Sequence, residues 1–372
     1  MPQLRHIIGI MSGTSLDGID AAFVRLEGQG LNLRLIDARL GSGPLGPASE
    51  ILASLAQGQS VPAEHYARAA TELGRSCGML ARKILEEDTV DLAVVHGQTV
   101  FHRPPYSLQL LNPAPIAEAL DCPVLFDLRG ADLAAGGQGA PITPLADWIL
   151  FRGTSPHSVI NLGGFCNATH LPDLAGDPDT ITAMDICPCN HLLDHAARRL
   201  FDQPFDESGT HAGRGTLDSD LAREIMVLLA HNETDRSLGT GDEDLKALAP
   251  LWRCEDPCTA LATLAEVLAR KICENIPSQQ SRIILAGGGA RNKALVEAIR
   301  RQTEMEVCTS NEYGIDVQAR EAVAMAVLGA LVQDGVSICL PQVTRPSRPS
   351  GSDGCWCLPG TMKDPIRAHR SN

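Results

Sequence analysis

The chain has 372 residues, of which 44% are hydrophobic and 20% are charged. A chain of this length and ordinary globular composition is expected to form two domains, each with its own core. The formal net charge of -14 disfavours a nucleic acid or an anionic membrane as partner, because the surface as a whole repels polyanions.

The beginning of the chain lacks the apolar core of a secretory signal, since Arg5 and His6 precede only a short apolar run. The longest apolar run, 322–332, is shorter than the roughly 18 residues that a membrane-spanning helix needs. The twelve cysteines are scattered over a long chain, which is typical of free thiols. We therefore expect a cytoplasmic protein.

The first half begins with β-rich runs and continues with a helical pattern. The expected strands cover 7–11, 19–26 and 31–40, and the expected helix covers 63–87. A buried strand at 91–95 follows and ends at His96-Gly97-Gln98-Thr99.

The second half repeats this plan. A hairpin at 158–171 turns at Gly163 and Gly164 and is followed by a strand at 180–185. The next expected elements are helices at 189–201, 217–231 and 261–275 and a strand at 282–286 that ends in a glycine turn. The repetition predicts an α/β fold of two duplicated domains.

The expected domains are residues 1–152 and 153–345. The boundary falls between Ile149 and Pro156, where a helix beginning at Ile142 runs into a segment rich in Gly, Ser and Pro. Residues 346–372 form a tail rich in Pro, Gly and Ser, for which we expect loop or partial disorder.

Three glycine-containing segments are suited to a nucleotide. Residues 12–20 (SGTSLDGID) offer backbone N–H groups to phosphates and carboxylates to Mg²⁺, although a tight turn alone also needs glycine. Residues 161–167 (NLGGFCN) supply a second turn, so that two facing turns clamp phosphates. Residues 286–292 (AGGGARN) add a glycine loop before a helix.

Two other nucleotide-binding motifs do not fit. A P-loop is absent, because no glycine precedes a lysine, and Asn292 replaces the third glycine of a dinucleotide fingerprint.

These segments and several others resemble, in order, the motifs of the anhydro-N-acetylmuramic acid kinases. The matching stretches are 9–20, 96–99, 136–141 (GGQGAP), 161–167, 286–292, Gly314-Ile315 and Glu321-Ala322. The resemblance implies two ribonuclease-H-like domains of the actin-like ATPase class with an interdomain cleft. It also implies an ATP- and Mg²⁺-dependent enzyme of peptidoglycan recycling that opens 1,6-anhydro-N-acetylmuramic acid with water and phosphorylates O6.

The resemblance assigns roles to individual residues. Asp185 matches the general base and Glu321 reaches into the substrate cleft. The residues implied to bind the sugar are His96, Gln98, Arg129 and Asn190. Asp17 is implied to hold Mg²⁺. The nucleotide is implied to contact Gly13, Thr14, Ser15, Leu16, Asp17, Gly18, Ile19, Asp20, Asn161, Gly163, Gly164, Gly287, Gly288, Gly289 and Asn292.

Two of these roles have structural alternatives. His96 ends a buried strand, so it either contacts the ligand or caps the strand through backbone hydrogen bonds. Glu321 lies one turn into a helix expected to begin after Asp316, where it also complements the helix dipole.

The chain departs from the family pattern at two places. The family has Thr-Gly-Pro-Gly-Asn after the aspartate, whereas this chain has Ile186, Cys187, Pro188, Cys189 and Asn190. The family's consecutive arginines before GGQGAP are reduced to Arg129, which weakens a contact to a lactyl carboxylate. A kinase for another anhydro sugar and a non-catalytic nucleotide- or sugar-binding protein therefore stay open as alternatives.

A structural zinc site is a third alternative. Cys187, Cys189, His191 and His195 lie close together in the sequence, although their spacing matches no common zinc site. The simpler interpretation is two cytosolic thiols and two histidines on a helix surface. The expected partner is a small sugar, with a homodimer as an open alternative for the assembly.

Overall fold

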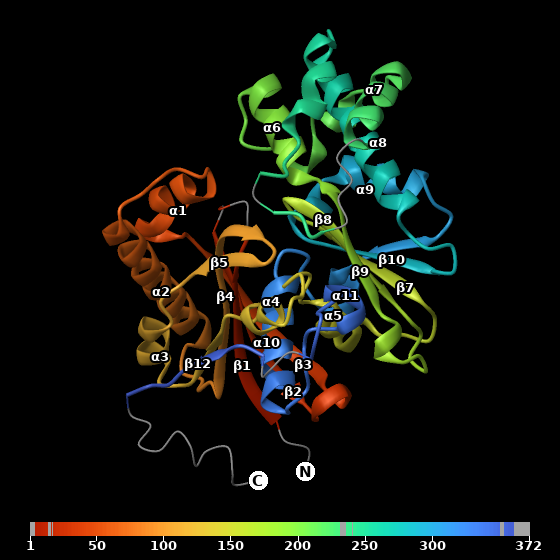
Figure 1. Ribbon diagram of the computed structural model, residues 1–372. Coiled ribbons are helices and arrows are strands. Elements are labelled where there is room, and N and C mark those ends of the chain that lie inside the picture. Colours follow the sequence, from red (N-terminus) through yellow and green to blue (C-terminus); the bar gives the residue numbers. More distant parts are fainter. Residues whose placement is uncertain are drawn as a thin grey trace. The chain divides into compact units, whose positions relative to one another are not determined.

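The computed structural model describes residues 4–13, 16, 18–230, 236–239, 241–349 and 353–360. The chain divides into two compact units, the first made of 1–150 with 321–372 and the second of 151–320. Figure 1 shows the elements of each unit. The expected nucleotide-binding residues Thr14, Ser15 and Asp17 lie outside the described residues.

The first unit contains a seven-stranded sheet. Its strands are β1 (Leu4–Ser12), β2 (Ile19–Glu27), β3 (Arg34–Gly43), β4 (Leu92–Arg103), β5 (Tyr106–Leu110), β6 (Val124–Phe126) and β12 (Cys355–Cys357). Its helices are α1 (Ser49–Ala56), α2 (Ala63–Leu85), α3 (Ala114–Leu120), α4 (Gly130–Ala134), α5 (Pro144–Phe151, whose last residue begins the second unit), α10 (Arg320–Gln333, whose first residue ends the second unit) and α11 (Pro341–Thr344).

The strand order of this sheet is β12-β6-β4-β1-β2-β3, with β5 paired to β4. β1, β2 and β3 are antiparallel neighbours, whereas β4 and β6 run parallel to β1. The carboxyl ends of β1 and β4 therefore meet at one edge of the sheet, where α/β proteins place their ligands.

Helices cover both faces of the first sheet. On one face, a Cβ at Gly41 would lie 2.9 Å from Ile84 of α2. On the other face, a Cβ at Gly9 would lie 2.0 Å from the carbonyl oxygen of Ala322 in α10. The sheet and α10 therefore approach so closely that only glycine fits at position 9. In Figure 1, α1, α2 and α3 lie together beside the sheet.

The second unit contains a five-stranded sheet. Its strands are β7 (His157–Leu162), β8 (Phe165–Leu171), β9 (Thr182–Pro188), β10 (Arg282–Ala286) and β11 (Glu306–Thr309). Its helices are α6 (Asn190–Phe201), α7 (Ser219–Ala230), α8 (Pro257–Glu274) and α9 (Lys293–Arg301).

The second sheet repeats the topology of the first. β7, β8 and β9 are antiparallel neighbours, and β10 and β11 run parallel to β7. The order β9-β8-β7-β10-β11 thus corresponds strand for strand to β3-β2-β1-β4-β6. Three antiparallel strands followed by two parallel ones define the ribonuclease-H-like fold, so the predicted duplication is confirmed.

Several elements differ from their expected bounds. β4 continues past Val95 to Arg103 because it forms a hairpin with β5. α10 begins at Arg320, later than the expected start after Asp316. Residues 321–345 pack with the first unit, whereas we expected 153–345 to form one domain, and the reason is the close packing of α10 on β1. In the expected tail, 355–357 form β12, which pairs with β6.

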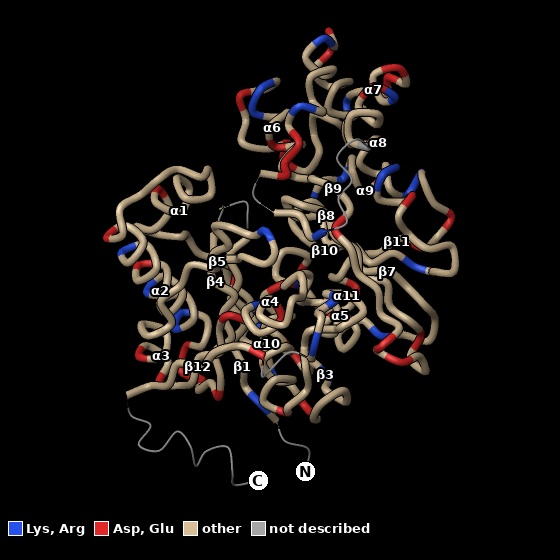
Figure 2. The backbone as a smooth tube through the Cα atoms, viewed as in Figure 1, with Lys and Arg blue, Asp and Glu red and all other residues tan. Residues whose placement is uncertain are grey.

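Charged residues are spread over both units (Figure 2). Lys and Arg occur on elements throughout both units (Figure 2). Within the described part of the chain, every helix is too short or too polar to span a bilayer.

Candidate active site

The first glycine turn lies at the carboxyl end of β1. The carbonyl oxygen of Gly13 accepts hydrogen bonds from the backbone N–H of Leu16 (3.2 Å) and from Nε2 of Gln98 (3.0 Å). A Cβ at Gly18 would lie 2.8 Å from the carbonyl oxygen of Gly43. After this turn, β2 begins at Ile19. The turn is thus attached to β4 through Gln98.

Polar side chains lie on the strands next to this turn. Oδ1 of Asp20 accepts a hydrogen bond from the Ser42 hydroxyl at 2.5 Å. Ser12 and Gln98 are paired between β1 and β4, and both are buried. Ser12 Oγ and Gln98 Oε1 have no hydrogen-bond partner among the described residues. Buried oxygen atoms in this state fit a polar ligand such as a phosphate with a cation.

A buried histidine holds the arginine of the first unit. Nε of Arg129 donates to Nε2 of His96 at 2.9 Å, and Nη1 donates to the carbonyl oxygen of Gly139 at 2.8 Å. Nδ1 of His96 lies 3.0 Å from the carbonyl oxygen of Gly97. Burial, together with the charge of Arg129, lowers the pKa of His96 to about 3. The imidazole is therefore neutral at physiological pH.

Glu321 lies in the first turn of α10 and is half-buried. It belongs to the first unit, where α10 covers the sheet. Its position in the first turn suits the helix dipole, and its expected role in the substrate cleft stays a prediction.

Three segments that are distant in sequence meet in the second unit. Gly287, at the end of β10, has φ +83°, and a Cβ there would lie 2.8 Å from Oδ1 of Asn161 and from Leu162. A Cβ at Gly289 would lie 2.7 Å from Oδ1 of Asn190. Nδ2 of Asn190 donates to the carbonyl oxygen of Leu162 at 3.1 Å. Glycine is thus required where the second turn, the Gly287 loop and the start of α6 touch.

The remaining residues of these segments form caps. The carbonyl oxygens of Gly163 and Gly164 accept from the N–H groups of Asn190 (3.0 Å) and Cys189 (2.8 Å). Oδ1 of Asn292 caps α9 by accepting from the N–H of Leu295 at 3.1 Å. Gly288 begins the short turn 288–291 that leads to this cap. The ends of β7 and β10 are thereby joined to the starts of two helices, an arrangement that suits an anionic nucleotide.

One polar row crosses the end of the second sheet. Asn161 on β7 is paired with Asn167 on β8, and Asn167 is paired with Asp185 on β9. A bulge places Ile186 outside the pairing, because Cys166 pairs with Cys187. Paired residues share a face of a sheet, so the expected base and Asn161 lie on the same face. Asn161 Oδ1 is buried and has no partner within the described ranges.

Asn167 was not among the expected site residues. It stands in the second glycine motif, six residues after Asn161, and the two strands of a tight hairpin pair residues at such symmetric positions. The short turn at Gly163 and Gly164 therefore carried the signal that would have identified it.

Asp185 lines a pocket of about 720 Å³ within the second unit. Its Oδ2 accepts a hydrogen bond from the N–H of Leu238 at 2.7 Å. The volume suits a small-molecule ligand. The charged residues of the lining are Asp185, Asp242, Glu243, Asp244, Lys246 and Lys271.

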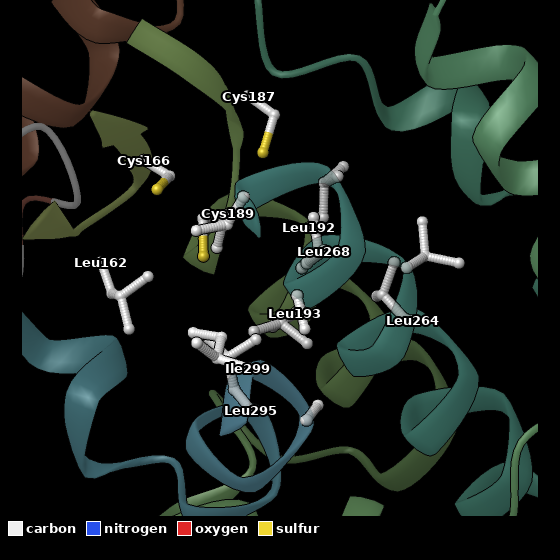
Figure 3. Close-up of a cluster of buried hydrophobic side chains, with 14 of the residues drawn as sticks. Leu162, Cys166, Cys187, Cys189, Leu192, Leu193, Leu264, Leu268, Leu295 and Ile299 are labelled. Carbon is white, nitrogen blue, oxygen red and sulfur yellow. The ribbon is translucent and has the colours of Figure 1, made fainter. Parts of the chain in front are cut away.

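Cys187 and Cys189 are thiols of the hydrophobic core. Figure 3 shows them among the leucines of α6, α8 and α9. Burial raises the pKa of the Cys187 thiol to about 12 and that of Cys189 well above its usual range, whereas zinc binds thiolates. No metal-binding group of three or more His, Cys, Asp or Glu occurs among the described residues, which include His191 and His195. The zinc alternative thus lacks a site there.

The departure from the family's glycines has a local explanation. Cys189 has φ -126°, outside the left-handed region that requires glycine, and its side chain is fully buried. Cys187 lines the pocket beside Asp185, whereas Cys189 does not. Only Cys187 is therefore placed to reshape the pocket.

Two ribonuclease-H-like units, each with a glycine turn at the end of its first strand, define the class of actin-like phosphotransferases. Solved structures resemble the chain over most of its length. Component A of Acidaminococcus fermentans (R)-2-hydroxyglutaryl-CoA dehydratase is 13% identical (TM-score 0.47; 89% of this chain and 99% of that chain). A ROK family glucokinase from Streptomyces griseus is 12% identical (TM-score 0.38; 87% and 98%).

Residues 5–353 match the family described as anhydro-N-acetylmuramic acid kinase. Relatives with that description come from Salinibacter ruber (34% identical, 91% of this chain and 93% of the relative) and Bordetella pertussis (34%, 91% and 93%). Another comes from Bacillus cereus (31%, 87% and 91%). The chain belongs to the anhydro-N-acetylmuramic acid kinase family, as the motifs predicted, and is a phosphotransferase.

Proposed function

We propose that the protein is an ATP- and Mg²⁺-dependent kinase that opens 1,6-anhydro-N-acetylmuramic acid with water and phosphorylates its O6. Asp185 is the general base. The observation that carries the proposal is the row of Asn161, Asn167 and Asp185, which sets a carboxylate in register with the residues around the Gly287 loop. Family membership supports the sugar. The role that we propose is cell-wall amino-sugar recycling in the cytoplasm.

The reaction balances as one hydrolysis coupled to one phosphoryl transfer. Asp185 takes a proton from water while the water oxygen bonds to C1 of the sugar. The C1–O6 bond breaks, and the electron pair left on O6 attacks the γ-phosphorus of ATP. ADP leaves with the electron pair of the broken P–O bond. The products are ADP, the 6-phosphosugar and a proton.

The residues of each unit have separate tasks in this reaction. The N–H of Leu238, 2.7 Å from Oδ2, fixes the orientation of the Asp185 carboxylate. Asn161 Oδ1, which has no partner among the described residues, would accept from a ligand hydroxyl. Backbone N–H groups at the Gly13 and Gly163 turns would bind phosphates.

Oxygen atoms beside the first turn fit Mg²⁺, which prefers oxygen ligands. Asp20 would hold the ion, together with Asp17, which the family resemblance adds. The bound ion would neutralise charge on the phosphates.

The test combines purified protein, Mg-ATP and the anhydro sugar in ¹⁸O-labelled water. We expect equal amounts of ADP and 6-phosphosugar, with the label at C1 and none in the phosphate. Asp185→Asn should lower turnover by about 10²- to 10⁴-fold, whereas Asp220→Asn, the same change of charge on the exposed surface of α7, should leave it unchanged. Label in the phosphate, or no ADP with any anhydro sugar, would contradict the proposal.

The acidic pocket lining favours a second candidate, a kinase for an anhydro sugar without a carboxylate. The four carboxylates of the lining outnumber its two lysines, Lys246 and Lys271, and the net negative charge repels a lactyl carboxylate. Comparing kcat/KM for anhydro-N-acetylmuramic acid and anhydro-N-acetylglucosamine separates the candidates. Binding in a calorimeter without turnover would instead identify a non-catalytic nucleotide- or sugar-binding protein.

A further inference from the structure

A hydrogen-bonded chain of four residues runs through the first unit. It begins at the carbonyl oxygen of Gly97, passes through the ring of His96 to the guanidinium of Arg129, and ends at the carbonyl oxygen of Gly139. His96 is only 3% exposed, whereas Arg129 is half-buried. The buried His96 ring therefore supports the guanidinium of Arg129, which is more exposed.

The direction of these hydrogen bonds fixes the tautomer of His96. An arginine N–H can only donate, so Nε2 of His96 accepts from Arg129 and carries no proton. The proton of the neutral ring then resides on Nδ1, which donates to the carbonyl oxygen of Gly97. If Nε2 of His96 were also protonated, its N–H and the Nε–H of Arg129 would both be donors, and their hydrogen bond would be lost.

The far end of the chain is also fixed. The N–H of Gly139 donates to Oδ2 of Asp132 at 2.7 Å, and Oδ1 of Asp132 accepts from the Thr344 hydroxyl at 2.7 Å. Asp132 is fully buried. The Gly139 carbonyl that receives Arg129 therefore belongs to a rigid network.

We propose that His96 is a positioning residue whose neutral ring holds the Arg129 guanidinium so that it receives an anionic oxygen of the ligand. The inference rests on the proposed function, in which that oxygen belongs to a sugar carboxylate or to the nucleotide's phosphate. A guanidinium matches both groups through paired N–H donors. Holding it on two sides removes the entropy that it would otherwise lose on binding.

Two variants of His96 separate this role from capping of the strand. Glutamine places its terminal amide where Nε2 stands, so His96→Gln keeps an acceptor for Arg129 and loses the donor to Gly97. Asparagine places its amide where Nδ1 stands, so His96→Asn keeps the donor to Gly97 and loses the acceptor. The proposal predicts that His96→Asn weakens binding of the anionic ligand on the order of tenfold, and that His96→Gln recovers most of it.

Calorimetry with the full chain measures the dissociation constants. The ligands are anhydro-N-acetylmuramic acid, anhydro-N-acetylglucosamine and a non-hydrolysable ATP analogue. If only anhydro-N-acetylmuramic acid binds more weakly, Arg129 binds the sugar carboxylate. If only the ATP analogue binds more weakly, Arg129 binds a phosphate of the nucleotide. Arg129→Gln should weaken the same ligand, and His96→Asn should add little to it in the double variant. Equal losses in both His96 variants, or additive losses in the double variant, would overturn the inference.

Two controls keep the inference separate from the proposed function. ¹H–¹⁵N spectra of the imidazole should show a protonated Nδ1 and a bare Nε2, and the opposite tautomer would overturn the geometry even in an inactive protein. If the wild type binds but does not turn over, the proposed function fails, whereas the pattern of His96 variants still decides the inference. If turnover is normal but His96→Asn binds every ligand like the wild type, only the inference fails.

Discussion

The two units share one topology but place their acidic residues differently. In the first sheet, the row at the end of β1 is Met11, Asp20 and Ser42, so the carboxylate stands on the middle strand. In the second sheet, the corresponding row is Asn161, Asn167 and Asp185, so the carboxylate stands on the edge strand β9.

This difference gives the two carboxylates different surroundings. Asp20 accepts a hydrogen bond from the Ser42 hydroxyl of the neighbouring strand. Asp185 accepts instead from the backbone N–H of Leu238 and lines a pocket. A duplicated sheet can therefore serve two tasks, because an edge strand exposes its acid to a ligand while a middle strand surrounds it with neighbours.

The largest effect is expected from replacing Asp185, the acidic residue on the edge strand β9. Asp185→Asn removes the proton acceptor and should lower kcat by about 10²- to 10⁴-fold, the usual contribution of a general base. Asp20→Asn should mainly raise KM for ATP, because its expected partners are the phosphates and Mg²⁺. A coupled ADP assay measures both constants, and equal effects of the two variants on kcat would remove the proposed division of tasks.

The second prediction concerns the glycine loop of the second unit. Gly287→Ala adds a Cβ at φ +83° and 2.8 Å from Asn161 and Leu162, so both backbone strain and overpacking should destabilise the protein, by about 2–4 kcal/mol in total. Gly314 has φ +76° with nothing within 4 Å, and Gly314→Ala should cost only the strain, about 1 kcal/mol. Urea unfolding compares the variants, and equal losses would show that the Gly287 loop is not tightly packed.

The third prediction concerns two buried histidines, His96 in the first unit and His170 in the second. Burial is the main cause that lowers the pKa of His96 to about 3 and that of His170 to about 4. The unfolded chain takes up protons below about pH 6.5, whereas the folded protein does not. The free energy of unfolding should therefore fall as the pH drops from about 6.5 to about 4, by roughly 1.4 kcal/mol per pH unit for each histidine.

A variant of His170 tests how steeply the free energy of unfolding depends on pH. His170→Asn keeps an amide that can pair with the Ser158 hydroxyl, which lies 2.8 Å from Nδ1, but it does not titrate. Urea unfolding at several pH values should give a shallower loss for this variant than for the wild type. An unchanged slope would mean that His170 is protonated in the folded protein.

The smallest expected effect concerns the segment beside Asp185. Arg236 and Asp242 form a bidentate ion pair at 2.6 and 2.7 Å, which shapes the segment that carries Leu238. Arg236→Gln should lower kcat only a few-fold, because partly exposed ion pairs contribute little. Arg253→Gln, which removes an exposed pair with Glu224, should leave kcat unchanged. A large drop with Arg236→Gln would show that the orientation of Asp185 depends on this pair.

Much of the fold could be predicted from the sequence, because glycine turns and apolar runs are local signals. The hairpin at Gly163 and Gly164, the strand 282–286 and the long helix from Ala63 appear where the pattern predicted them. The extension of β4 to Arg103 was missed because pairing with β5 outweighs the polar residues after Val95. β12 was missed because Cys355–Cys357 is a strand only beside β6.

The motifs of the candidate site could be predicted from the sequence, but the pairing of its residues between neighbouring strands could not. Nothing local shows that Ile186 bulges, and this bulge decides that Asp185 pairs with Asn167. The position of Cys189 among core leucines also depends on packing between distant helices. The contact of His96 with Arg129 joins residues from two separate segments, which a single sequence does not reveal.

The close packing of α10 on Gly9 of β1 has a consequence for biosynthesis. The helix that covers one face of the first sheet is made only after the whole second unit. A ribosome therefore releases the amino-terminal strands with that apolar face bare, and the nascent chain must stay free of aggregation until residue 333 has emerged. Chains interrupted before α10 would expose this face permanently and should be recognised by chaperones and proteases.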